Sequence, residues 1–372
     1  MAKRRFSYPR VLNPASVTLG RGCLKTALDD EAQARVAVMV SGAAAVHEAA
    51  TAALPAAGAD VTWLTKPAGE PDAEAVAAAG RALADFAPSV VLAVGGGSVL
   101  DWARLSWAAG AGLLDPQAPV ASLSVAPAAA PSFVLVPTTC ATGAESATVA
   151  VMMSAGRKCP VVADAFMAHR VFLDPQFIEA LSQARTALFL CDAASHAIEA
   201  FVSIVPNRIA RETAASALGL LRRGFSDTPD SATREQLMLG SYFAGAAASH
   251  LSVGLAHAFA HTAARYGVSH ALGNALALPA TARRLAAAGK LDELAAQAGF
   301  GPAAELVAWV EALAAAGSAE GARGALDAGL GDAAARADFV GAMRGDVCMR
   351  TTPLRLAEAE VEAFVAEVVD AA

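Results

Sequence analysis

The segment VVLAVGGGSVLDWAR, residues 90–104, passes from a strand pattern through three glycines into a helix pattern. Val90–Val94 is a short continuous apolar run, which is typical of a strand buried on both faces of a sheet. Glycines after such a strand let the backbone approach a ligand closely and present its N–H groups. The residues expected to do so here are Gly95, Gly96 and Gly97.

The helix pattern that follows the glycines adds the positive end of a helix dipole, which favours anions. Ser98 and Asp101 are spaced as in a capping box at that helix start, and we predict that both lie at the binding site. The functional interpretation is a site for the pyrophosphate of a dinucleotide. The alternative is a plain tight turn between a strand and a helix, because a glycine cluster alone is weak evidence.

Working outward, short β-branched runs alternate with alanine-rich helical stretches up to about residue 178, which favours a parallel sheet covered by helices. After that point the strand signals stop and the chain is predicted to be helical. We therefore expect an α/β dinucleotide-binding domain over residues 1–178 and an all-helical domain over 179–372. The predicted strands are Ser16–Leu19, Val36–Ser41, Val61–Leu64, Val90–Val94, Phe133–Val136 and Val171–Leu173.

A second predicted strand, Phe133–Val136, also ends in small polar residues. In open α/β sheets, ligands bind at the carboxyl ends of the strands, so this end is expected to lie beside the glycine cluster. The residues predicted to contribute there are Thr138, Thr139 and Thr142.

Composition excludes several classes of protein. The 372 residues carry a net charge of −7 and a mean hydropathy of +0.44, and the isoelectric point near 5.5 argues against nucleic-acid binding. Much of the apolar fraction is alanine, and no run reaches the roughly 20 strongly apolar residues of a membrane-spanning helix. Five scattered cysteines without a C-x-x-C pair favour a reduced, cytoplasmic protein.

Histidines and one aspartate form a pattern typical of a metal site. Asp192 and His196 are four residues apart, as are His257 and His261, so each pair lies on one face of a predicted helix. His270 follows shortly after. A carboxylate with neutral imidazoles suits Fe, Zn, Mn or Ni, although any one of these histidines alone would more often be a core residue. Spacing alone does not decide whether His257 or His261 binds the metal.

Seven motifs, in this order and spacing, resemble the iron-containing, or group III, metal-dependent alcohol dehydrogenase family. They are GRG at 20–22, GGGSVLDWAR at 95–104, PTTCATGAE at 137–145, GRK…LDP at 156–175, DAASHAIEAF at 192–201, HAFAH at 257–261 and HALGNALALP at 270–279. The resemblance covers nearly the whole chain. It implies the dehydroquinate synthase-like architecture, with a cleft between the two domains, and homodimers are common in that family.

The resemblance also implies roles for individual residues. Asp192, His196, His257 and His270 would bind Fe²⁺ or Zn²⁺, and His261 would be the non-ligand histidine beside the nicotinamide and the substrate. Lys158 stands where the family often has a lysine near the nucleotide. Arg104 replaces a frequent lysine, and Ala141 a frequent glycine.

Gly42 follows the second predicted strand at a position where relatives that prefer NADH often carry an aspartate. An aspartate there would bind the ribose 2′-hydroxyl and repel a 2′-phosphate. Its absence favours NADPH, or weak discrimination between NADPH and NADH.

The resemblance implies a metal-dependent oxidoreductase that interconverts an aldehyde or ketone and an alcohol. The metal would act as a Lewis acid on the substrate oxygen. Ser195 and Asn13-Pro14 look like phosphonoacetaldehyde reductases, so an anionic aldehyde is one expected substrate. The alternatives are a maleylacetate reductase-like enzyme, a Zn-dependent glycerol dehydrogenase-like enzyme and a protein that has lost activity. Arg265 and Lys158 are candidate contacts to an anionic substrate by sequence position only.

Overall fold

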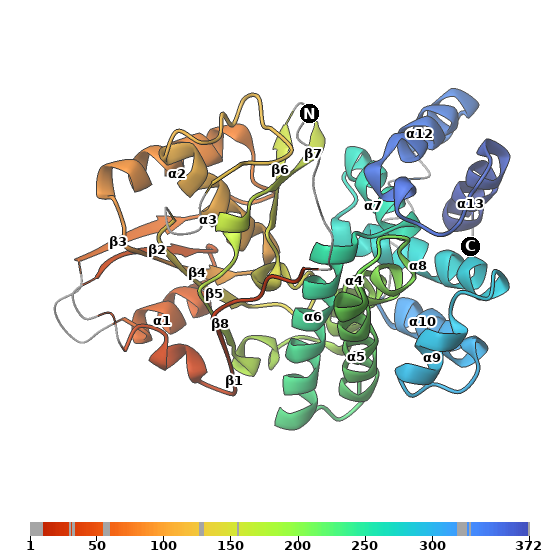
Figure 1. The fold of residues 1–372 in the computed structure, drawn as a ribbon, viewed down its shortest axis with the longest axis horizontal. Coiled ribbons are helices and arrows are strands. Elements are labelled where there is room, and N and C mark those ends of the chain that lie inside the picture. The colour runs from red at the N-terminus through yellow and green to blue at the C-terminus, as the bar shows by residue number, and fades with distance from the viewer. Residues whose placement is uncertain are drawn as a thin grey trace. The chain divides into compact units, whose positions relative to one another are not determined.

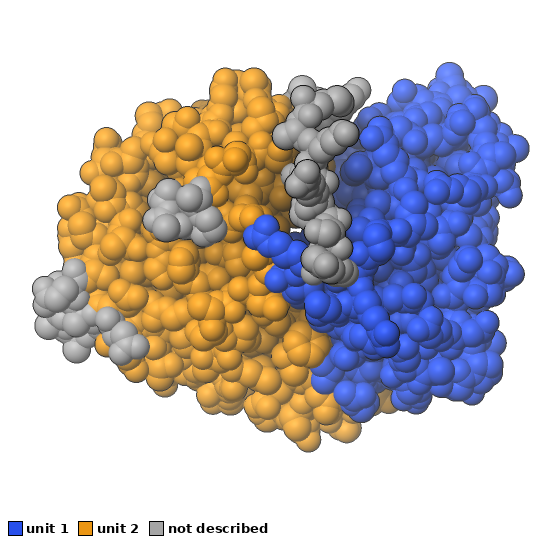
Figure 2. All heavy atoms as spheres, in the orientation of Figure 1, with its two compact units in different colours: residues 1–11, 182–225, 246–372 blue, residues 12–181, 226–245 orange. Residues whose placement is uncertain are grey.

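The chain packs as two compact units, which Figure 2 distinguishes by colour. The sheet unit comprises Leu12–Leu181 and Ser226–Gly245, and the helical unit comprises Met1–Val11, Ser182–Phe225 and Ala246–Ala372. The predicted domain limits 1–178 and 179–372 stay a prediction, to which the structure adds that residues 226–245 pack with the sheet unit. The computed structural model describes residues 10–29, 31, 34–54, 60–125, 130–154, 156–317, 326 and 329–370.

The sheet unit is built on six parallel strands in the order β1-β8-β5-β4-β2-β3. All six strands predicted from the sequence are present, with ends that shift by one residue at most, and the parallel α/β prediction is confirmed. Their bounds are β1 Ser16–Leu19, β2 Arg35–Val40, β3 Asp60–Thr65, β4 Val90–Gly95, β5 Ser132–Pro137 and β8 Arg170–Leu173.

Helices cover both faces of this sheet, as Figure 1 shows, with α1 on one face and α2 and α3 on the other. The central strands β2, β4 and β5 are buried on both faces, which explains their unbroken apolar runs. α2 begins after Asp72, whose carboxylate caps it by accepting the N–H of Ala75. The helix bounds are α1 Ala44–Ala52, α2 Ala73–Phe86 and α3 Gly97–Gly110.

An antiparallel hairpin that the sequence analysis did not predict follows β5. Its strands are β6, Val149–Ser154, and β7, Arg157–Val162. Gly156 lies between them with φ of 72°, a left-handed conformation that glycine adopts without strain.

Three loops meet at one edge of the parallel sheet. Val40 of β2 pairs with Val94 of β4, and Gly95 of β4 pairs with Pro137 of β5, so these strands end at the same level. From β2 the chain proceeds outward to β3, and from β4 it proceeds to the other side, to β5. The reversal between β2 and β4 is a topological switch point, the position at which open α/β sheets bind ligands.

The helical unit contains only helices among its described regular elements, as the sequence predicts. Within the described residues, none of the helices combines the length and the apolar character needed to cross a membrane. The helices are α4 Gln183–Val202, α5 Arg208–Gly224, α6 Ser231–Leu251 (its first part in the sheet unit), α7 Leu255–Ala263, α8 His270–Ala287, α9 Asp292–Gln297, α10 Ala303–Ala316, α12 Ala333–Gly345 and α13 Glu358–Asp370.

A close backbone contact explains why the first part of α6 belongs to the sheet unit. A Cβ atom at Gly245 would lie 2.3 Å from the carbonyl oxygen of Gly143, and one at Gly143 would lie 2.3 Å from the carbonyl oxygen of Ser241. Gly143 also has φ of 59°. The loop after β5 therefore lies directly against α6, and only glycine fits on either side.

Substitution of Gly245 by alanine tests this contact. We expect Gly245→Ala to lower the free energy of unfolding by about 1–3 kcal/mol, because backbone atoms rather than a flexible side chain must move. Gly341→Ala in α12 is the matched control, since nothing lies within 4 Å of its added methyl group. The control should gain up to about 1 kcal/mol from helix propensity. Urea unfolding measures both, and equal stability of the two variants would contradict the account.

Candidate functional site

The glycine cluster leaves the start of α3 open. α3 begins at Gly97 with Gly96 as its N-cap residue, and no side chain caps it. The predicted capping box of Ser98 and Asp101 is therefore wrong, because the helix starts two residues earlier than a Ser98 cap requires and the N-cap residue, Gly96, has no side chain. The first N–H groups of a helix have no partner within the helix, so this N-terminus is suited to an anion.

The predicted threonines line the same loop. A Cβ atom at Gly97 would lie 2.6 Å from Oγ1 of Thr142, and one at Gly96 would lie 3.5 Å from Thr139. The N–H of Thr138 donates to the carbonyl oxygen of Gly95 at 3.0 Å. The structure thus brings the glycines and the threonines together at one edge, and side chains on the glycines would fill the space there.

Asp101, in the second turn of α3, makes a hydrogen bond to the hairpin, and its predicted place at the cofactor site stays a prediction. Its Oδ2 accepts the N–H of Val151 at 3.0 Å, which anchors β6 to the helix. Burial raises the pKa of Asp101 to about 7, against the opposing charge of Arg104. Arg104 is fully buried and donates to the carbonyl oxygens of Phe166, Ala144 and Ala147 at 2.8–3.1 Å. Arg104 therefore holds the segment after β5 and the segment before β8 against α3.

Gly42 and Lys158, the other two residues predicted to bind the cofactor, lie on different parts of the sheet unit. Gly42 follows β2 at the switch point, with nothing within 4 Å of a Cβ built on it. Lys158 lies on β7, and its Nζ is 3.1 Å from Oε1 of Glu70, which follows β3. The lysine is thus paired with an acidic side chain, and its predicted contact with the nucleotide stays a prediction.

Four side chains of the helical unit converge into one cluster: Asp192 and His196 from α4, His257 from α7 and His270 from α8. One donor atom from each lies within 4.8 Å of the others. Nε2 of His196 is 3.2 Å from Nε2 of His257, and Nε2 of His270 is 3.6 Å from Oδ1 of Asp192. Ligand atoms that share one metal at about 2.0–2.2 Å lie about 3–3.5 Å apart, close to these separations.

Hydrogen bonds to the other ring nitrogens fix the tautomers of two histidines. Nδ1 of His196 is 2.9 Å from the carbonyl oxygen of Asp192, which can only accept, so Nδ1 carries the proton. Nδ1 of His257 is 2.7 Å from Oε2 of Glu199, and both oxygens of Glu199 also accept backbone N–H groups. Burial lowers the pKa of His257 well below its usual value, so the ring is neutral. Two unprotonated Nε2 atoms therefore face each other.

Glu199 was not predicted as a site residue. Its carboxylate accepts the N–H groups of Gly254 and Ala256, which caps the start of α7, as well as Nδ1 of His257. Burial raises the pKa of Glu199 to about 7, and these hydrogen bonds oppose the rise. Glu199 lies three residues after His196 on the same helix face, so spacing could have identified it.

Asn274, four residues after His270, is the second residue that was missed. Its Nδ2 donates to Oδ1 of Asp192 at 2.7 Å and lies 3.4 Å from Nε2 of both His257 and His270. Acceptor atoms of three side chains therefore surround one neutral amide NH₂ group.

The cluster fits a divalent cation on electrostatic grounds. Asp192 and Glu199 are both buried, and the ion pairs found for them among the described residues involve only histidines. Buried carboxylates without a lysine or arginine nearby are costly. A divalent ion held by Asp192 and the three histidines would offset that cost and the repulsion between the facing Nε2 lone pairs. Three nitrogens and one oxygen suit iron or zinc.

His261 lies outside this group of four. Its ring stacks on that of His270, with 5.4 Å between centroids. Its Nδ1 is 3.1 Å from Oδ2 of Asp346, in the segment after α12. The structure therefore places His261 outside the group of four, and its predicted role beside the nicotinamide and the substrate stays a prediction.

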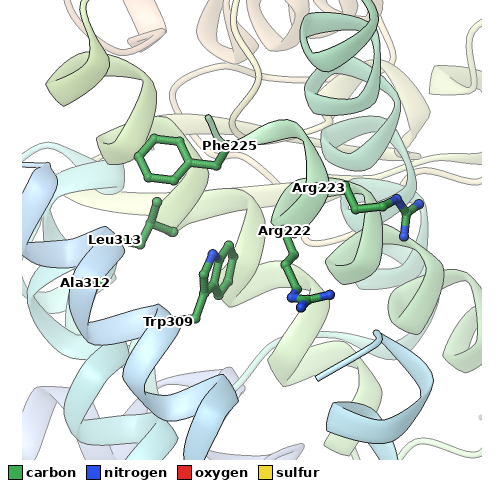
Figure 3. Close-up of a pocket in the computed structure, with 6 residues that line it drawn as sticks. All are labelled: Arg222, Arg223, Phe225, Trp309, Ala312 and Leu313. Atoms are coloured by element: carbon green, nitrogen blue, oxygen red, sulfur yellow. The ribbon is translucent and has the colours of Figure 1, made fainter. Parts of the chain in front are cut away.

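A pocket of about 480 Å³ in the helical unit is lined by none of the predicted site residues (Figure 3). The guanidinium carbon of Arg222 lies 4.8 Å from the ring centre of Phe300, and Arg223 is its neighbour in the last turn of α5. The positive charge of both arginines complements the negative end of the α5 dipole, and this structural role explains them without a ligand. The lining residues are Arg222, Arg223, Phe225, Trp309, Ala312 and Leu313.

Family models match nearly the whole chain. Residues 14–175 match the iron-containing alcohol dehydrogenase model, and residues 186–369 match the C-terminal model of the Fe-containing alcohol dehydrogenase family.

Curated relatives agree with the family models. The probable alcohol dehydrogenase EutG of Salmonella typhimurium is 32% identical over 294 residues, which cover 74% of this chain and 72% of that protein. Its namesake in Escherichia coli is 33% identical over 238 residues, which cover 62% of this chain and 60% of that protein. The sulfoacetaldehyde reductase of Bilophila wadsworthia is 28% identical over 186 residues, which cover 48% of this chain and 47% of that protein.

Solved structures support the fold. An iron-containing alcohol dehydrogenase from Thermococcus thioreducens superposes with a TM-score of 0.85 at 22% identity, covering 98% of this chain and 100% of that chain. A sulfoacetaldehyde reductase from Bifidobacterium kashiwanohense, solved with NAD⁺, gives 0.80 at 20% identity with the same coverage.

Replacement of Glu199 by glutamine tests how the cluster is held. Glutamine has the same size as glutamate, but its NH₂ group would face an N–H donor where the wild type has a carboxylate oxygen. We expect the affinity for Fe²⁺ or Zn²⁺ to fall about 10–100-fold, as for other partners of metal-binding histidines. Competition with a chromophoric chelator measures it. Glu212→Gln, at an exposed pair with Arg208 on α5, is the control. Unchanged affinity in Glu199→Gln would remove the proposed role.

Proposed function

The chain belongs to the iron-containing alcohol dehydrogenase family, and from that premise we propose that it interconverts an aldehyde and an alcohol with a nicotinamide cofactor and a divalent metal. The observation that carries the proposal is the pair of facing Nε2 atoms of His196 and His257, 3.2 Å apart, with both Nδ1 atoms committed as donors. Asp192 and His270 complete the proposed ligand set. Iron is the proposed ion, with zinc as the alternative.

When bound, the metal supplies a Lewis acid for the substrate oxygen and the nicotinamide supplies the hydride. The chain itself supplies geometry and a proton. His261 donates Nδ1–H to Asp346, which leaves Nε2 as the atom that exchanges a proton with the substrate. In the sheet unit, the open start of α3 is proposed to bind the cofactor's phosphates through the Gly96–Ser98 backbone.

We infer an anionic short-chain aldehyde, such as phosphonoacetaldehyde, as the substrate class. Two relatives support this choice by name, a sulfoacetaldehyde reductase and a 4-hydroxybutyrate dehydrogenase. The two residues that the sequence offers for binding the anion both form ion pairs with acidic side chains: Arg265 lies 3.7 Å from Asp338 and Lys158 lies 3.1 Å from Glu70.

Cytoplasmic location and a homodimer also stay proposals, and light scattering of the purified protein tests the latter.

A substrate panel tests the proposed reaction. Protein loaded with one equivalent of Fe²⁺ or Zn²⁺, without excess metal, should oxidise NADH or NADPH with short aldehydes. The kcat/KM should be larger for carboxylated, sulfonated or phosphonated aldehydes than for neutral ones. His257→Ala should lose both bound metal and turnover, whereas His250→Ala on α6, outside the cluster, should keep both. Failure of every aldehyde with metal-loaded protein, or full activity in His257→Ala, would overturn the proposal.

The cofactor preference is tested at Gly42. We expect Gly42→Asp to shift the ratio of kcat/KM from NADPH toward NADH by about tenfold, since a carboxylate there repels a 2′-phosphate and accepts from a 2′-hydroxyl. The open space around Gly42 accommodates the side chain. Gly42→Asn adds the same bulk without the charge and should shift the ratio much less. An equal shift in both variants would mean that charge at this position does not select the cofactor.

A further inference from the structure

A second group of metal-binding side chains lies in the helical unit: His261 of α7 with Asp346 and Cys348, which follow α12. One donor atom from each lies within 4.8 Å of the others. Nδ1 of His261 is 3.1 Å from Oδ2 of Asp346 and 3.9 Å from Sγ of Cys348. Nothing in the family resemblance assigns these three residues a metal.

Local structure holds the three side chains in place. Asp346 caps the short 3₁₀ helix Val347–Arg350, and its Oδ1 accepts the N–H of Cys348 at 2.8 Å. The other carboxylate oxygen, Oδ2, is thereby directed toward His261. Oγ1 of Thr351 donates to the carbonyl oxygen of Val253 at 2.6 Å, which ties this segment to the residues just before α7. The donors are therefore arranged before any ion binds.

The distances between the donor atoms are close to those of a tetrahedral zinc site. Zinc bonds of about 2.0–2.3 Å at tetrahedral angles put ligand atoms about 3.3–3.7 Å apart. The observed 3.1 Å and 3.9 Å differ from that range by a few tenths of an ångström. A sulfur, a nitrogen and an oxygen are the donors that zinc and cobalt accept together, and a water molecule can complete the four. The cluster around Asp192 has no sulfur.

The three side chains differ in their exposure to solvent. Cys348 is buried, whereas His261 and Asp346 are partly exposed, so an ion can enter past them.

We propose that His261, Asp346 and Cys348 form a second metal site, for Zn²⁺ or a similar thiophilic divalent ion, whose occupation inhibits the enzyme. The inhibition rests on the proposed function. An ion bound to Cys348 and to Nδ1 of His261 displaces the thiol proton to solvent, and the one proton of the neutral ring moves from Nδ1, where Asp346 accepts it, to Nε2. The ring can no longer exchange a proton with the substrate at that atom.

Cobalt titration tests the site without any assay of turnover. Metal-free protein is titrated with Co²⁺, and a sulfur-to-cobalt charge-transfer absorption in the near ultraviolet reports a bound thiolate. We expect this band in the wild type and in Cys23→Ser, a control thiol of the sheet unit, and its loss in Cys348→Ser and Cys348→Ala. Both Cys348 variants should still bind cobalt at Asp192, which reports that they are folded. Absence of the band from the wild type, or its persistence in both variants, would overturn the proposal.

Inhibition is measured separately, in wild type whose first site is already filled. Added Zn²⁺ should abolish NAD(P)H oxidation. The Zn²⁺ concentration that gives half-inhibition should be at least about tenfold higher for Cys348→Ala than for the wild type. Equal zinc sensitivity would refute the inhibitory role. If no aldehyde is reduced while the cobalt–thiolate band appears as expected, the proposed function fails and the metal site stands.

Discussion

The proposed metal centre depends on the hydrogen bonds that the buried carboxylate of Glu199 accepts. It accepts hydrogen bonds from the first N–H groups around the start of α7 and from Nδ1 of His257. One side chain of α4 thus fixes where α7 begins and which nitrogen of His257 is unprotonated. Without it, a buried helix start would lose its cap, and the histidine could present either nitrogen to the cluster.

In the part of the chain that the structure describes, each unit gathers polar groups without an internal partner of opposite character: hydrogen-bond acceptors in the helical unit and backbone N–H donors in the sheet unit. In the helical unit, acceptor atoms of Asp192, His196 and His257 converge without a lysine or arginine beside them among the described residues. In the sheet unit, the N-terminus of α3 has no side-chain cap. A chain selected for stability alone would satisfy such groups internally, so their arrangement favours one site for a cation and one for an anion.

Sequence patterns predicted the features that depend on local spacing. A buried strand such as Val90–Gly95 is recognisable in the sequence as a continuous apolar run. Asp192 and His196 share a face because they are four residues apart in a helix. Glu199 lies on that same face, but an acid in a helix more often faces solvent. Asp346 and Cys348 meet His261 across more than 80 residues of chain, and no local period links them. The predicted capping box is wrong because Gly96, two residues before Ser98, is the N-cap residue of α3, so Ser98 already lies inside the helix.

Anomalous X-ray diffraction at the iron absorption edge, on crystals of the protein loaded with Fe²⁺ under anaerobic conditions, tests the central claim most directly. The account predicts one strong peak within bonding distance of Asp192, His196, His257 and His270, with Nδ1 of His257 still facing Glu199. A peak at other side chains only, or no peak in iron-loaded crystals, would contradict it.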